Sequence, residues 1–124
     1  MVTDVSEMQS RIIGMLKKHI GDLQISKETE SNFEVIGTKP GMQGKKKVNG
    51  YYFSSVVPKP KDVRLYFFPI YTHKEGIGEL PQPLAKCLKG KSCFHIKKMD
   101  EELESQLITM IDKGIELYKK DGLI

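Results

Sequence analysis

The chain has 124 residues, of which 39% are hydrophobic and 29% charged, and its 20 lysines and arginines outnumber its 16 aspartates and glutamates. This length suits one domain that folds without disulfides or a structural metal. No stretch comes near the ~18 consecutive apolar residues that a membrane span requires. The first ten residues carry acids where a secretory signal would carry bases. We therefore expect a single cytoplasmic domain over residues 1–124, with no membrane partner and with Cys87 and Cys93 as free thiols.

An amphipathic helix is predicted at each end of the chain. From Thr3 to Gly21, apolar residues recur three and four positions apart, which is typical of a helix with one buried face. The same spacing runs from Asp100 to Gly122. Thr3 and Asp100 are the predicted N-caps, and the two glycines suit the ends of the helices. Each helix therefore has one apolar face to bury.

The middle of the chain is predicted to form a sheet because it is rich in β-branched and aromatic residues. Strands are expected at residues 33–37, 51–57, 63–70 and 92–97. Residues 22–32 are polar without a clear period, residues 39–47 suit an exposed loop, and residues 84–88 suit a short helical turn. The order of these elements favours an α+β fold: an antiparallel sheet of about four to five strands with the N-terminal and C-terminal amphipathic helices packed on one face.

Aromatic residues are expected on both faces of this sheet. Strict alternation places Tyr51, Phe53, Ser55 and Val57 on one face, opposite Tyr52, Ser54 and Val56. In the next strand, Leu65 and Phe67 oppose Tyr66, Phe68 and Ile70. Two helices are enough to cover one face, so the other is the predicted binding face for a small ligand, an ion or a protein partner. The candidate ligand-binding residues are Tyr52, Tyr66, Phe68 and His95, with Tyr71 and His73 at the rim.

Two alternatives to this binding face stay open. His73, Cys93 and His95 are candidate ligands for iron or zinc, although their spacing is not that of a structural zinc site. Lysines form two clusters that suit an anion or single-stranded nucleic acid: Lys39, Lys45, Lys46 and Lys47, and then Lys86, Lys89, Lys91, Lys97 and Lys98. No recognised nucleic-acid signature accompanies them, so a nucleic-acid partner is not favoured.

An enzyme is favoured less than a binding protein. Cys93 and His95 share a strand face, but such neighbours stand about 7 Å apart, too far for direct proton transfer. No set of nucleophile, base and oxyanion donors can be assembled from the sequence. The sequence therefore predicts a non-enzymatic binding protein with no obligatory cofactor.

The segments from Tyr66 to His73 (YFFPIYTH) and from Lys86 to Lys98 (KCLKGKSCFHIKK) carry a resemblance to a known family. Together with the closing helix, they make residues 33–120 similar to the YdhG-like family of domains of unknown function. The resemblance implies a compact α+β domain. Some relatives are discussed as frataxin-like intracellular iron carriers, so the resemblance also implies iron binding as an alternative.

Overall fold

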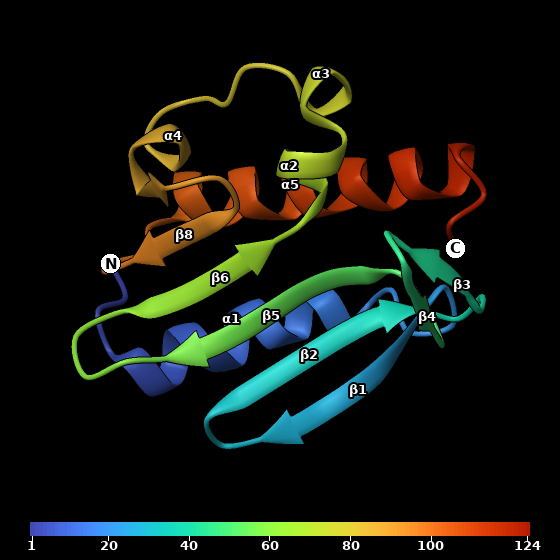
Figure 1. The fold of residues 1–124 in the computed structure, drawn as a ribbon. Coiled ribbons are helices and arrows are strands. Elements are labelled where there is room, and N and C mark those ends of the chain that lie inside the picture. Colours follow the sequence, from blue (N-terminus) through green and yellow to red (C-terminus); the bar gives the residue numbers. More distant parts are fainter.

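An antiparallel sheet of six strands forms the centre of the computed structural model, which describes residues 1–124 (Figure 1). The strands lie in the order β1-β2-β5-β6-β8-β7, and β3 and β4 form a separate two-stranded sheet. The strands are β1 (Leu23–Thr29), β2 (Asn32–Gly37), β3 (Gly41–Gln43), β4 (Lys46–Val48), β5 (Tyr52–Pro58), β6 (Val63–Phe67), β7 (Leu88–Lys89) and β8 (Cys93–Ile96). The helices are α1 (Val5–Lys17), α2 (Pro69–Thr72), α3 (Lys74–Ile77), α4 (Leu84–Cys87) and α5 (Glu101–Lys120). The predicted α+β class is confirmed.

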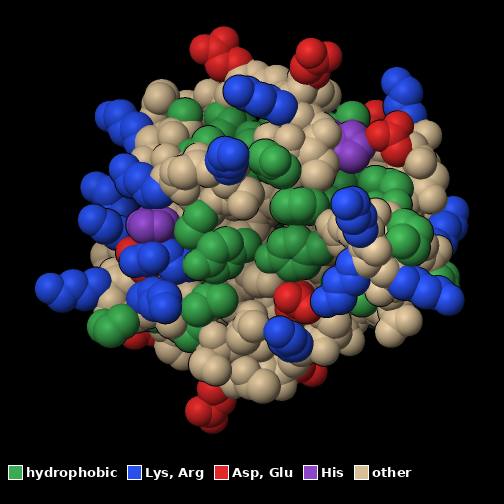
Figure 2. All heavy atoms as spheres, in the orientation of Figure 1, with side chains coloured by type: hydrophobic (Ala, Val, Ile, Leu, Met, Phe, Trp, Pro, Cys, Tyr) green, Lys and Arg blue, Asp and Glu red, His purple; other side chains and the backbone are tan.

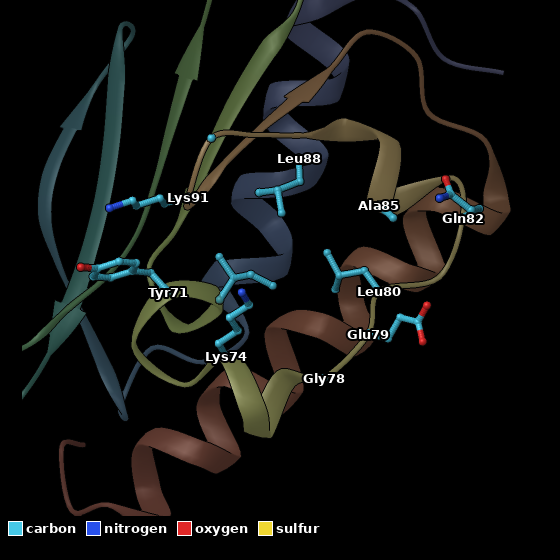
Figure 3. A pocket seen from close by; sticks show the side chains of 11 residues that line it. Tyr71, Lys74, Gly78, Glu79, Leu80, Gln82, Ala85, Leu88 and Lys91 are labelled. Atoms are coloured by element: carbon cyan, nitrogen blue, oxygen red, sulfur yellow. The ribbon is translucent and has the colours of Figure 1, made fainter.

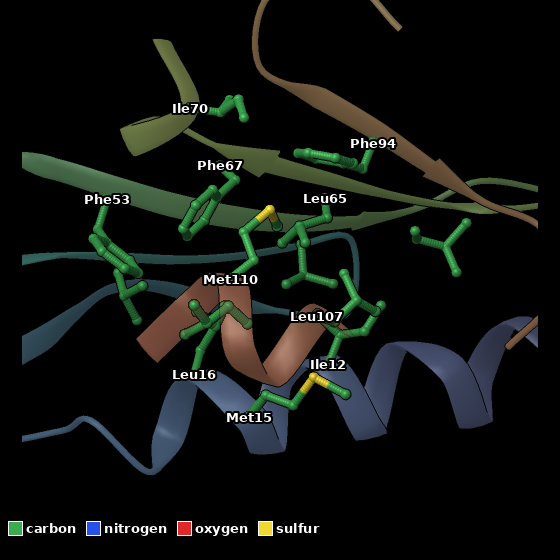
Figure 4. Packing of buried hydrophobic residues seen from close by; sticks show 14 of the residues in the cluster. Ile12, Met15, Leu16, Phe53, Leu65, Phe67, Ile70, Phe94, Leu107 and Met110 are labelled. Atoms are coloured by element: carbon green, nitrogen blue, oxygen red, sulfur yellow. The ribbon is translucent and has the colours of Figure 1, made fainter. Parts of the chain in front are cut away.

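Both long helices pack on the same face of the sheet. In Figure 4, Leu107 and Met110 of α5 point toward Leu65 and Phe67 of β6, and the buried side chains of α1 lie beneath them. All four of these residues are 4% exposed or less. The apolar stripes predicted for the two helices are therefore the surfaces that close the core. The buried residues on α1 are Met8, Ile12, Met15 and Leu16.

The ends of the helices follow local capping chemistry. The carboxylate of Asp100 accepts a hydrogen bond from the backbone N–H of Leu103 at 2.8 Å, so the predicted N-cap of the last helix is confirmed. At the first helix the cap is Asp4 rather than Thr3, with the N–H of Glu7 donating to it at 2.9 Å. That helix also ends at Lys17, before the predicted Gly21, because the chain must turn to begin β1 at Leu23.

The sheet has more strands than the predicted four to five. The polar segment 22–32 contains β1, an edge strand in which only Leu23 is buried. The side chains of β1 after Gln24 are exposed, so its composition lacks the apolar alternation of a half-buried strand. The segment 39–47, predicted as a loop, contains the hairpin of β3 and β4, which turns at Gly44 with φ of +64°. The turn residues of this segment could be recognised in the sequence, but the pairing of β3 with β4 could not.

A β-bulge changes the faces predicted for β5. Val35 of β2 pairs with Ser54, whereas the next residue, Ile36, pairs with Tyr52. Phe53 is therefore the extra residue, and it joins Ser54 on the core side, where both are fully buried. Strict alternation across β5 was wrong for this reason. Beyond the bulge, Tyr52, Ser55 and Val57 share the face opposite the helices.

Strand β6 ends at Phe67, three residues before the predicted Ile70. Pro69 occupies the first turn of α2, where its fixed φ suits a helix and its missing N–H costs nothing. Ile70 is consequently a buried helical residue instead of a strand residue on the open face. No helix in the fold is both long enough and apolar enough to span a membrane.

Candidate functional site

The sheet face opposite α1 and α5 is left without a helical cover. Figure 2 shows this face with hydrophobic side chains gathered across its middle and lysines and arginines on both sides of them. Pairing across the strands places Ser55 beside Tyr66, and Tyr66 beside Cys93. The neighbouring row pairs Val57 with Arg64 and Arg64 with His95. We call this surface the open face.

Three of the predicted residues form one aromatic cluster on the open face. The ring of Phe68 lies 5.4 Å from that of Tyr52 and 5.7 Å from that of Tyr71, measured between ring centroids. The hydroxyl of Tyr52 donates to Oγ of Ser55 at 2.7 Å. Burial raises the pKa of Tyr52 to about 12 against the opposing effect of that hydrogen bond. Tyr71 is 52% exposed, so the cluster runs from a half-buried ring to one that is open to solvent.

Tyr66 and Cys93 are direct cross-strand neighbours between β6 and β8. Burial is the main cause that raises the pKa of the Cys93 thiol, and the nearby Tyr66 hydroxyl and Arg64 oppose it. A raised thiol pKa leaves less thiolate at neutral pH, and the thiolate is the nucleophile. This environment suits a structural thiol better than a reactive one.

His95 lies at the β8 side of the open face, next to a partly buried charge pair. Its Nδ1 is 4.0 Å from Oδ2 of Asp62, and Oδ1 of Asp62 accepts a hydrogen bond from Nε of Arg64 at 2.9 Å. Asp62 itself is only 6% exposed, so the guanidinium of Arg64 compensates its buried carboxylate. Asp62 therefore constrains the orientation of Arg64 and lies close to His95 without a direct hydrogen bond to it.

His73 is engaged elsewhere, at the C-terminal end of α5. Its Nε2 lies 2.6 Å from Oδ2 of Asp121, and its ring stacks beside Tyr118 with 5.3 Å between centroids. His95, by contrast, shares a cavity with Asp100 at the other end of α5, a helix about 30 Å long at 1.5 Å per residue. The structure therefore does not bring His73 together with Cys93 and His95. No group of three or more His, Cys, Asp or Glu side chains is arranged to hold a metal ion.

The lysines predicted as an anion site also separate into two places. Lys39, Lys45, Lys46 and Lys47 lie on or beside the β3–β4 hairpin. Lys91 is in the turn between β7 and β8, where its Nζ lies 5.6 Å from the ring centroid of Tyr71. Lys91 thus belongs with the aromatic cluster, whereas the other four do not.

A groove of about 580 Å³ opens beside this cluster, and sequence reasoning did not find it. In Figure 3, Leu80 and Leu88 point toward one another across the groove, Tyr71 and Lys91 lie together at one end, and Glu79 and Gln82 lie at the other. The remaining lining residues are Ile70, Lys74, Gly78, Ala85 and Gly90. We call it the α2–α4 groove. Its only sequence signal was the Gly- and Pro-rich stretch from Thr72 to Pro83, which has no regular period to show what it encloses.

Comparison of the chain with known protein families, with curated proteins and with solved structures gave no match. The resemblance to the YdhG-like family therefore stays a prediction, and so does the iron binding that it implies. The α+β class, predicted from the sequence, is confirmed by the structure and not by any relative.

Proposed function

We propose that this chain is a non-enzymatic binding protein that takes a small anionic ligand with an apolar or aromatic body in the α2–α4 groove. The observation that carries this proposal is the pairing of Lys91 with Tyr71 at the mouth of an apolar groove. Ligand sites are typically cavities of about 300–1,000 Å³ with mostly apolar walls and a few well-placed polar groups. The volume of about 580 Å³ lies within that range.

The charges of the groove define the ligand class. Lys74 and Lys91 line the groove, and neither forms an ion pair with an acid of the chain. Glu79 is the one acid in the lining, and it lies at the end away from Lys91 (Figure 3). An anionic group beside either lysine would gain charge-assisted hydrogen bonds, while the body of the ligand would cover Leu80 and Leu88.

The aromatic cluster extends the site from the groove onto the open face. Tyr71 lines the groove and also stacks on Phe68, which in turn contacts Tyr52. A planar group bound against the exposed ring of Tyr71 would add an offset-stacked pair to this row. The residues expected to bind the ligand are thus Tyr71 and Lys91 directly, with Phe68 and Tyr52 supporting Tyr71.

The probe for this proposal is 8-anilinonaphthalene-1-sulfonate, which combines an aromatic body with one negative charge and fluoresces when bound to apolar surface. We expect saturable binding of one probe per chain to the folded protein. Lys91→Ala should weaken it by up to about fivefold, since an exposed ion pair between the ammonium group and the sulfonate is worth about 0.2–1 kcal/mol. Tyr71→Ala should weaken it more, because the ring that the probe contacts is lost.

Lys45→Ala is the matched control. Lys45 and Lys91 are both exposed lysines that follow a positive-φ glycine in a hairpin turn, Gly44 and Gly90. The control variant should bind the probe as the parent does. Equal weakening by both lysine variants, or the lack of saturable binding, would overturn the proposal.

A further inference from the structure

A second cavity lies next to the α2–α4 groove and has a different chemistry. Its volume is about 370 Å³, and it is lined by α4, β7, β8 and the start of α5. The side chains of this short stretch divide between the two cavities: Ala85 and Leu88 line the groove, whereas Lys86, Cys87 and Lys89 line the second cavity. We call it the basic pocket. Its full lining is Met1, Pro83, Lys86, Cys87, Lys89, His95, Lys97, Lys98, Asp100 and Leu103.

Four lysines line the basic pocket together with His95. None of the four forms an ion pair with an acid of the chain. A sphere of 370 Å³ is about 9 Å across, comparable with the Debye length of about 8 Å at physiological ionic strength. An anion within the cavity would therefore lie within about one Debye length of the residues that line it, so salt would not fully screen its attraction to these lysines.

Three acids lie at the start of α5 outside the basic pocket, and Asp62 lies behind His95, paired with Arg64. Glu101, Glu102 and Glu104 line an adjoining hollow, which shares Met1 and Asp100 with the basic pocket. Arg11 also lines this hollow, and its guanidinium donates to Glu104 at 2.8 Å. Asp100 is the one acid of the basic pocket, and its Oδ1 is engaged as the N-cap of α5. The lining of the basic pocket therefore holds four lysines against one aspartate, which gives it a net positive charge.

We propose that the basic pocket is a binding site for a small anion that carries two or more phosphate groups. Lysine ammonium groups bind phosphate as point charges, and four of them match the charge of several phosphate groups better than that of one. The lysines gather in one hollow of the fold instead of forming a stripe along the surface. A single hollow suits a compact anion, whereas a nucleic-acid backbone would need an extended track with stacking rings along it.

This inference does not depend on the ligand proposed for the α2–α4 groove. The two cavities share none of their lining residues. A change at Lys91 tests binding in the groove, whereas changes at Lys97 and Lys98 test binding in the basic pocket. Either proposal can therefore fail while the other holds.

The test is isothermal titration of the protein with inorganic tripolyphosphate at constant ionic strength. We expect saturable binding of one anion per chain, with orthophosphate binding at least tenfold more weakly. The double variant Lys97→Gln and Lys98→Gln should weaken tripolyphosphate binding at least tenfold. Both residues are exposed and outside any helix or strand, so the fold should not change, and circular dichroism would check this.

The matched control is the double variant Lys46→Gln and Lys47→Gln. These two lysines are also adjacent and exposed, and their loss changes the net charge of the chain by the same amount. The control should bind tripolyphosphate as the parent does. Equal weakening by both pairs would mean attraction by overall charge only and would overturn the proposal. So would the lack of saturable binding, or tighter binding of a single-stranded oligonucleotide that the Lys97 and Lys98 changes do not affect.

Discussion

Gly114 marks a close approach of α5 to the sheet. A Cβ atom added there would lie 2.6 Å from Cζ of Phe67, 3.1 Å from Cγ of Pro69 and 3.3 Å from Cζ of Phe53. Phe53 and Phe67 are fully buried and meet edge to face with 5.3 Å between their centroids. Neither ring can turn away without losing contacts in a close-packed core. We predict that Gly114→Ala destabilises the fold even though alanine is the better helix former.

The magnitude follows from two opposing effects. In a helix interior, Gly→Ala gains about 1 kcal/mol from propensity. Forcing an extra methyl group into a packed core costs about 1–3 kcal/mol. The free energy of unfolding should therefore fall by up to about 2 kcal/mol in Gly114→Ala.

Gly14 in α1 isolates the steric effect. It is exposed, and nothing lies within 4 Å of a Cβ added to it, so Gly14→Ala should gain the propensity effect of about 1 kcal/mol alone. Propensity cancels when the two variants are compared, and the gap between them should equal the steric cost of about 1–3 kcal/mol.

The assay is urea unfolding of the parent and both variants, followed by circular dichroism. The midpoint should rise in Gly14→Ala and fall in Gly114→Ala, while the slope with urea stays the same. If Gly114→Ala proved as stable as Gly14→Ala, the close approach of α5 to Phe67 would be refuted. A changed slope in either variant would show that more than local packing had been altered.

Two further predictions concern pH and thiol reactivity. Burial raises the pKa of Tyr52 to about 12 and raises that of Tyr118 as well. Because the folded state holds these protons more tightly than the unfolded state, the contribution of these two tyrosines to stability should be constant below about pH 10 and should be lost as the pH rises toward 12 and beyond. Spectrophotometric titration checks this: Tyr52→Phe should remove one late step, and simultaneous ionisation of all five tyrosines would contradict the prediction. Burial also raises the pKa of the Cys87 and Cys93 thiols, so iodoacetamide at neutral pH should modify them more slowly in the folded protein than in urea. Labelling of folded Cys93 at the urea rate would show a reactive thiol instead.

Local patterns in the sequence were enough to predict the elements that are specified by residues close together in the chain. The helix of residues 101–120 and its cap at Asp100 follow from apolar spacing and from one carboxylate that bonds three residues ahead. The hairpin of β5 and β6 follows from its composition and from the prolines between its strands. The alternation in β8, with Phe94 and Ile96 buried, was also correct. Each of these features depends on neighbours within a few residues.

The candidate site was partly predictable for the same reason. Tyr52, Phe68 and Tyr71 were expected on the open face, and they form one cluster there. His73 was expected with them, but its contacts to Tyr118 and Asp121 come from a helix 45 or more positions away in the chain, and no local pattern encodes such contacts. The bulge at Phe53 was missed because it is specified by the register of β2 against β5.

By itself, therefore, the sequence determined the class of fold, both terminal helices and the existence of a face rich in aromatic residues. Only the tertiary structure decided which lysines act together. Lys86, Lys89, Lys97 and Lys98 were seen in the sequence as one loose cluster that also held Lys91. The pairing of β7 with β8 turns Lys91 toward Tyr71 and gathers the other four around a single pocket. The physical reason is that charge acts through space, and distance in space is set by strand pairing and helix packing, not by separation along the chain.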